Sequence, residues 1–162
     1  MRLMRNFILV FLLLPAPVSL MAQAQQETRA AETSQASDEV LAKLRTAAVL
    51  HETVQLALKE GKYSEIIPNL KKIFDLGLPR DYEKYQIKAV FSVIDKLDDS
   101  HQFVLGHKVA DLALENLQAD DSKFFLYLMK AKLFRDNDQT REASEAIEMS
   151  KKFEKQQKDR RK

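Results

Sequence analysis

The chain has 162 residues and a formal net charge of +2, with 26 basic and 24 acidic side chains. Two of the basic residues, Arg2 and Arg5, lie in an N-terminal segment that we expect to be removed, so the remaining chain is neutral and has no overall field to attract nucleic acid or anionic lipid. The absence of cysteine excludes disulfides, thiol redox chemistry, cysteine-ligated zinc and a lipid anchor on a cysteine.

The first 24 residues have the layout of a secretory signal peptide. Arg2 and Arg5 precede an apolar run over residues 7–14, and small residues follow as far as Ala24. We therefore expect cleavage between Ala24 and Gln25 and a mature protein in a periplasm or outside the cell. If the segment is not cleaved, the same apolar run would instead tether the chain to a membrane.

The residues after the cleavage site are expected to form a flexible leader and then a string of helices. Residues 25–36 are polar and lack any large apolar side chain, so they predict the leader. From residue 37 onward, apolar side chains recur every three or four residues, which is typical of amphipathic helices. We expect helices over residues 37–61, 63–76, 81–97, 100–117 and 123–134, and a last one from residue 138. No window shows the two-residue alternation of a strand.

The positions of glycine and proline support these helix boundaries. Gly61 and Gly77 stand where an apolar helical period stops, as helix-ending glycines do. Pro68 requires that the second helix either begins later or bends. Because the junctions are short, consecutive helices are expected to pack as antiparallel pairs, which gives three hairpins in a domain over residues 37–153. A basic tail over residues 154–162 follows, and it could approach an acidic partner, anionic lipid or a cell-wall polymer.

Two segments resemble the tetratricopeptide repeat, a helical hairpin that is repeated along a chain. The first is Gly61-Lys62-Tyr63-Ser64-Glu65-Ile66-Ile67, continued by Leu70, Ile73 and Pro79, and it is similar to the turn and second helix of a repeat. In the second, Ala131 matches the small residue of closest helix approach, Phe134 the aromatic one turn later, and Ala143 with Ile147 the packing pair of the second helix. Asp138 stands at the place of the turn glycine.

The middle hairpin, residues 81–117, keeps the helix-turn-helix layout, with Gly106 as a candidate small contact. The resemblance covers about residues 47–151. It departs from the family pattern at Ile66, where alanine is usual, at Pro68, and in the absence of tryptophan. It implies an all-α, right-handed superhelix of about three hairpins, and the alternative is a closed helical bundle.

In this family the first helices of the hairpins line a concave groove that takes up a peptide or a partner's helix. The resemblance implies that six residues of this chain face such a groove: His51, Gln55, Phe125, Leu128, Lys132 and Arg135. Lys132 and Arg135 lie three residues apart on one helix face, a spacing that can hold a carboxylate of the partner.

No group of residues has the spacing that catalysis or metal binding requires. His51-Glu52 begins like the helix of a zinc protease, but Gln55 stands where the second histidine is needed. His101 and His107 are six residues apart and point from poorly aligned helix faces. Acidic residues gather at the helix junctions, where helix capping explains them. We therefore expect no catalytic residue, no cofactor and no metal.

These patterns predict a non-catalytic, exported adaptor or scaffold that binds a protein or peptide in the cell envelope through its groove. Nucleic acid is not an expected partner, and a membrane is one only if the signal peptide is uncleaved. A homo-oligomer is possible because a short array leaves its end faces exposed. The alternative function is a helical bundle that binds a small ligand or a cell-envelope polymer.

Overall fold

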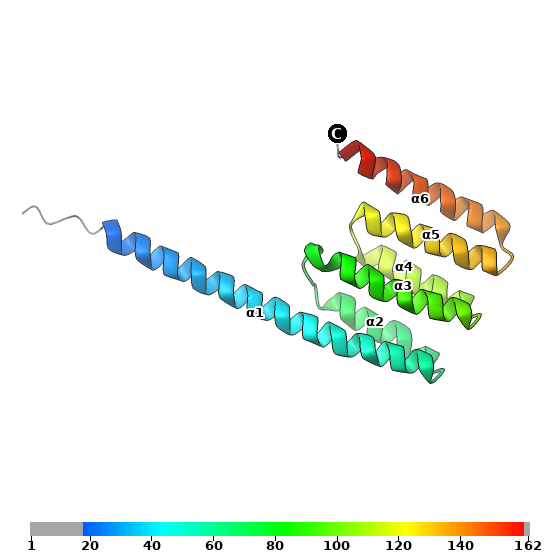
Figure 1. Cartoon of the computed structure of the whole chain (residues 1–162), viewed down its shortest axis with the longest axis horizontal. Coiled ribbons are helices and arrows are strands. Elements are labelled where there is room, and N and C mark those ends of the chain that lie inside the picture. Colours follow the sequence, from blue (N-terminus) through cyan, green and yellow to red (C-terminus); the bar gives the residue numbers. More distant parts are fainter. Residues whose placement is uncertain (1–17, 161–162) are drawn as a thin grey trace, which may run out of the picture. The chain divides into compact units, whose positions relative to one another are not determined.

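The computed structural model describes residues 18–160, with side chains from residue 37 onward, and the described chain is helical without any strand (Figure 1). This confirms the predicted all-α class. The elements are α1 (Val18–Lys59), the short 3-10 helix η1 (Tyr63–Glu65), α2 (Ile66–Asp75), the 3-10 helix η2 (Arg80–Tyr82), α3 (Glu83–Asp99), α4 (Phe103–Asn116), α5 (Asp120–Asp136) and α6 (Thr140–Arg160). Most of the expected signal peptide, residues 1–17, lies outside the described residues.

Helix α1 begins at Val18 and is 42 residues long, so it includes the segment 25–36 that was expected to be a flexible leader. This segment is rich in alanine, glutamine and glutamate, which have high intrinsic helix propensity and need no burial to adopt helical dihedrals. The chain divides into two units, residues 1–38 and 39–162, and the hydrophobic core lies in the second unit.

Pro68 fixes where the second helix begins. Helix α2 starts at Ile66, so Pro68 occupies its first turn, where a backbone N–H has no intrahelical acceptor. The residues before it, Tyr63–Glu65, form the separate 3-10 turn η1. Of the two expectations for this segment, the later start is therefore confirmed.

The turns within the three hairpins have the same backbone geometry. Each contains one residue in the left-handed region: Gly61 (φ 70°), His101 (φ 55°) and Asp138 (φ 59°). In each turn the next N–H reaches back to a carbonyl five residues earlier, in the bonds Lys62 to Ala57 (2.8 Å), Gln102 to Leu97 (2.7 Å) and Gln139 to Phe134 (2.8 Å). This is the Schellman arrangement that ends helices. Asp138 thus has the same left-handed conformation as Gly61 in the first hairpin.

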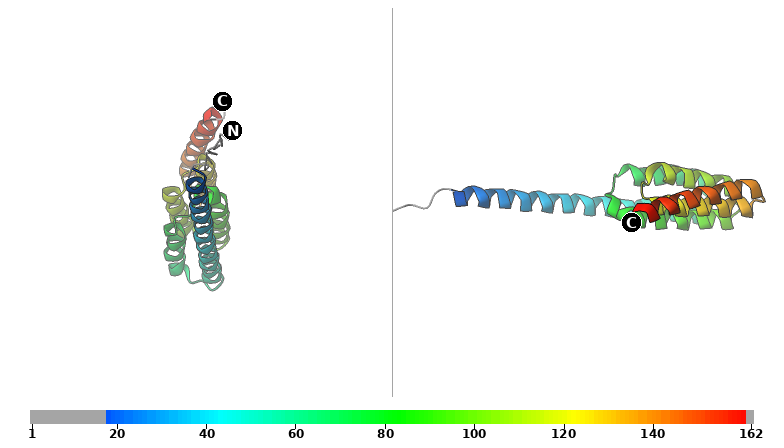
Figure 2. Two further views of the ribbon diagram at one scale, coloured as in Figure 1. Left: turned by 90° about the vertical axis from the view of Figure 1, so that its left-hand side faces the viewer. Right: turned by 90° about the horizontal axis from the view of Figure 1, so that it is seen from above.

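Helices of residues 39–160 lie in two layers. Contacts join α3 to α5 and α2 to α4, and they also join α4 to both α3 and α5. In Figure 1 the helices α3 and α5 form the nearer layer and α2 and α4 the more distant one, and Figure 2 shows the layers from two other sides. The core between them contains fully buried aliphatic side chains, including Val54, Leu70, Ile94, Leu97, Val109, Leu126 and Leu133.

Gly106 lets α4 approach α5 closely. It is buried within α4, and a Cβ atom added to it would lie 3.0 Å from Cδ1 of Leu133 on α5. Gly106 was expected as a small contact within the middle hairpin, and the close approach that the structure shows is instead to α5, the first helix of the next hairpin. Ala131, the small residue matched in the last hairpin, is 6% exposed.

The start of α5 receives polar groups from two neighbouring helices, α3 and α6. The side chain of Glu83, buried at the start of α3, accepts a hydrogen bond from the backbone N–H of Ala119, which precedes α5 (2.8 Å). Arg160, near the end of α6, lies 2.9 Å from the carboxylate of Asp120. Helix α6 thus continues through Arg160, and residues 154–160 are part of it rather than a separate basic tail, because their side chains pair with α5 and with each other.

Candidate functional site

The first helices of the three hairpins, α1, α3 and α5, are connected through their side chains. The amide of Gln55 on α1 accepts a hydrogen bond from the ammonium group of Lys96 on α3. On the other side of α3, Phe91 packs edge-on against Phe125 of α5, with ring centroids 6.1 Å apart. The six residues expected to line a groove lie on α1 and α5, and α3 stands between the two groups.

Phe125 and Leu128 form an exposed apolar strip on α5. Phe125 is 48% exposed and Leu128 37% exposed, whereas Leu126 between them is fully buried. Phe125 also contacts Phe124, with ring centroids 5.0 Å apart. The apolar segment over residues 124–128 therefore has one edge in the core and the other edge facing solvent.

A hollow of about 510 Å³ lies between α3 and α5, beside this strip. Its apolar part is made by Ile87, Phe91 and Phe125, and the exposed basic residues Lys84 and Lys88 stand on the α3 side. Lys84, Lys88 and Phe91 follow the spacing of one helix face, at intervals of four and three. That spacing is a signal in the sequence for the α3 contribution, which the six predicted groove residues did not include.

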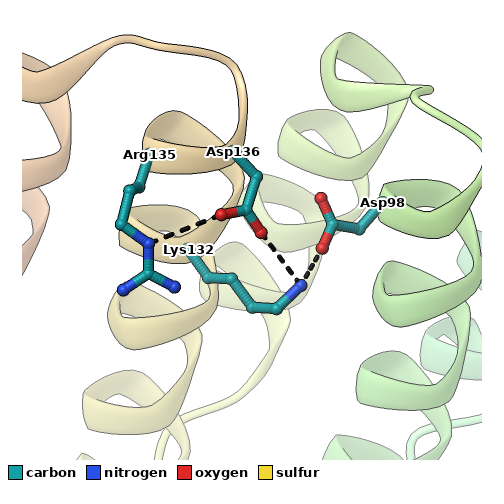
Figure 3. A network of polar contacts seen from close by, with 4 residues as sticks. All are labelled: Asp98, Lys132, Arg135 and Asp136. Carbon is teal, nitrogen blue, oxygen red and sulfur yellow. Dashed lines mark hydrogen bonds and ion pairs between the residues drawn. The ribbon is translucent and has the colours of Figure 1, made fainter.

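Lys132 is already paired within the chain (Figure 3). Its ammonium group forms an ion pair with the buried carboxylate of Asp98 on α3, and it lies 3.2 Å from Asp136 on its own helix. Arg135 Nε is 3.4 Å from Asp136, and the Arg135 side chain is 72% exposed. Burial opposes ionisation of Asp136, but hydrogen bonds and charges from Lys132 and Arg135 hold the pKa of its carboxyl below the usual value. Of the predicted basic pair, Arg135 is the residue that faces solvent.

His51 belongs to a different hollow from Phe125. It lines an apolar hollow of about 290 Å³ together with Leu44, Tyr82 and Tyr85. The amide nitrogen of Gln55 lies 3.3 Å from Nε2 of His51, and because that nitrogen can only donate, Nε2 is the acceptor. Burial lowers the pKa of His51, the positive charge of Lys96 lowers it further, and Glu52 opposes the shift. The six predicted residues therefore share one helical layer without forming one pocket.

The histidines do not form a metal site. Among the side chains that the structure describes, residues 37–160, no three of histidine, cysteine, aspartate or glutamate come close enough to hold a metal ion. His107 instead stacks on Phe134 of α5, with ring centroids 3.9 Å apart, and both of its ring nitrogens are buried without a hydrogen-bond partner. Burial lowers the pKa of His107, the nearby charge of Lys130 adds to this, and Asp111 opposes it.

We expect the free energy of unfolding to fall as the pH drops below about 6.5, the usual pKa of histidine. The pKa of His107 is lowered in the folded protein, so the unfolded chain takes up the proton first and acid favours unfolding. The free energy of unfolding is highest above about pH 6.5, and it decreases as the pH falls from there to the lowered pKa of the folded state. Urea unfolding at several pH values should show a flatter profile for His107→Phe, which keeps the ring stack. An unchanged acid loss in this variant would rule out His107 as its source.

Comparisons with protein-family models, curated proteins and solved structures find no match. The tetratricopeptide resemblance therefore rests on the residues themselves. In the described part of the chain, no helix has both the length and the apolar character to cross a bilayer.

Proposed function

We propose that this chain is an exported, non-catalytic adaptor that binds a protein or peptide in the groove between α3 and α5. The observation that carries the proposal is the exposed strip of Phe125 and Leu128 beside the apolar hollow of about 510 Å³. Exposed aromatic and aliphatic side chains next to a hollow are typical of binding surfaces, because a partner's side chain buries them on contact. The N-terminal signal-like segment supports export to a periplasm or to the outside of the cell.

We further propose that the helices form a tetratricopeptide-like right-handed superhelix. The equivalent turns at Gly61, His101 and Asp138 support a repeated hairpin. The contacts of α3 with α5 and of α2 with α4 support an array in which like helices are neighbours, as opposed to a closed bundle. In such an array the groove is formed before the partner arrives, which lowers the entropic cost of binding on the receptor side.

The hollow is lined by basic residues and by the acidic residues Asp81, Glu83 and Asp121, so it favours a partner that places a charged group of complementary sign beside its apolar side chains. Lys84 and Lys88 are exposed on its α3 side, and neither has an ion pair within the described residues. A segment that places one or two large apolar side chains against Phe125 and a carboxylate near Lys88 fits this arrangement.

The proposal is tested by capture of partners from the cell-envelope fraction of the host. Leu128→Asp introduces a charge into the strip, and we expect retention of the captured partner to fall about tenfold or more. The matched control is Val104→Asp, because Val104 is 71% exposed on α4, outside the α3/α5 groove. Thermal unfolding should be similar for both variants. Equal retention by both variants would contradict a binding surface at Leu128.

A further inference from the structure

One face of helix α1 is exposed within the unit of residues 39–162. Among the described residues, nine large hydrophobic side chains are exposed, and three of them lie on this helix: Leu41 (47%), Val49 (62%) and Leu56 (53%). Their spacing of eight and seven residues places them on one side of the helix. The exposed surface of α6, the last helix, is occupied mostly by charged residues that pair within their own helix, such as Arg141 with Glu145. Two of the nine, Ile147 (40%) and Met149 (36%), lie on α6, so the end face with more exposed apolar side chains is the one on α1.

The exposed stripe of α1 has an internal symmetry. At about 100° per residue, six exposed side chains fall within an arc of about 100°. They are Leu41, Arg45, Ala48, Val49, Glu52 and Leu56. A two-fold rotation about the midpoint between Ala48 and Val49 reverses the direction of the helix. This rotation exchanges the positions of Leu41 and Leu56, of Arg45 and Glu52, and of Ala48 and Val49. A surface with this property can contact a second copy of itself across a two-fold axis.

We propose that the α1 stripe pairs antiparallel with the same stripe of a second copy of this chain. Leu41 then packs against Leu56 of the second copy, Arg45 pairs with its Glu52, and Ala48 meets its Val49. This contact uses α1 and is separate from the groove between α3 and α5.

The charges on the α1 stripe favour a second copy of this chain as the partner, and they favour antiparallel pairing. Arg45 and Glu52 lie closest to the centre line of the stripe, and neither forms an ion pair within the described chain, although Lys43 on the same helix pairs with Glu39 (2.7 Å). An antiparallel pair brings two arginine–glutamate contacts together. A parallel pair in register would place Arg45 against Arg45 and Glu52 against Glu52, which is unfavourable.

The size of the stripe predicts a weak association. The segment from Leu41 to Leu56 spans 15 helical steps, or about 22 Å, so two such helices bury less surface than a standard stable interface. We therefore expect an equilibrium between monomer and dimer that depends on protein concentration.

Charge reversal tests the pairing by sedimentation velocity over about 1 to 200 μM protein, a range suited to weak dimers. Arg45→Glu alone and Glu52→Arg alone should each weaken the dimer about tenfold or more, because each creates like-charge contacts. The double variant carrying both changes should restore association to within about threefold of the unmodified chain. Val104→Asp on α4 serves as the control and should dimerise normally. A monomeric unmodified chain, or a double variant as weak as the single ones, would overturn the proposal.

Cysteine cross-linking tests the direction, and the chain is suited to it because it has no cysteine of its own. A mixture of Leu41→Cys and Leu56→Cys chains should form a disulfide-linked heterodimer under mild oxidation. Neither variant alone should cross-link efficiently, since its two thiols would lie about 22 Å apart in the antiparallel pair. Efficient cross-linking of Leu41→Cys with itself, or none in the mixture, would overturn the antiparallel arrangement.

Discussion

Replacing Gly106 with valine is expected to lower the free energy of unfolding by about 3 kcal/mol, at the upper end of overpacking costs. An added Cβ would lie 3.0 and 3.1 Å from the two Cδ atoms of Leu133. Leu133 is fully buried on α5, so it cannot move aside without disturbing the core. The two further methyl groups of valine would meet the same crowded interface between α4 and α5.

Chemical denaturation of Gly106→Val against the unmodified chain measures this loss. Gly106→Ala should be close to neutral, because the helix propensity gained by alanine offsets a tight contact. In a Leu133→Ala background, which removes the contacting atoms, Gly106→Ala should instead be stabilising. Gly77→Ala is a control in which nothing lies within 4 Å, and its cost of about 1 kcal/mol arises from the positive φ of 59°. A Gly106→Val variant as stable as the unmodified chain would show that α4 and α5 are not in this contact.

Replacing Lys132 with methionine is expected to lower the free energy of unfolding by about 2 kcal/mol. The change leaves the carboxylate of Asp98 buried without its counter-ion, and Oδ1 of Asp98 already has no hydrogen-bond partner. Asp98 is also the penultimate residue of α3, where the negative end of the helix dipole disfavours an anion. Because the Lys132 side chain is 38% exposed, water reduces the cost below that of a fully buried pair.

A double-mutant cycle separates this pairing from general packing. In an Asp98→Asn background, Lys132→Met should cost less than about 0.5 kcal/mol, since no buried charge remains to be stranded. Arg135→Met serves as the matched control on the same helix, and it should cost a similarly small amount because that side chain is 72% exposed. Equal effects of Lys132→Met in both backgrounds would contradict the Asp98–Lys132 pair.

Much of the helical architecture could be predicted from the sequence because its signals are local. Apolar periodicity placed the helices from residue 37 onward, and Gly61 and Gly77 marked left-handed helix ends that the structure confirms. His101 could not be predicted in the same way, since a histidine with a positive φ is rare and its conformation depends on the packing of both helices. The helical start of α1 at Val18 was not predicted. The segment 25–36 has high helix propensity but no large apolar side chain, whereas the other helices were predicted from their apolar periodicity.

The candidate site could be predicted only in part because its contacts join distant segments. The tetratricopeptide resemblance implied that Phe125 and Leu128 face a groove, and both are exposed on α5. The pairing of Lys132 with Asp98 links residues 34 positions apart, so it becomes visible only when α3 is known to lie beside α5. The spacing of Lys84, Lys88 and Phe91 places them on one face of α3, but the contact of Phe91 with Phe125 of α5 becomes visible only in the structure.

The two buried carboxylates of the described chain, Glu83 and Asp98, stand near opposite ends of α3, and each holds a group of the α5 segment. Glu83 accepts from the N–H of Ala119, and Asp98 binds the ammonium group of Lys132. Two such attachments, one near each end, oppose both axial sliding and splaying of α3 against α5. The separation of Phe91 from Phe125 is then set by the scaffold, so a partner bound in the proposed groove would meet walls of fixed spacing and would be selected by the width of its own side chains.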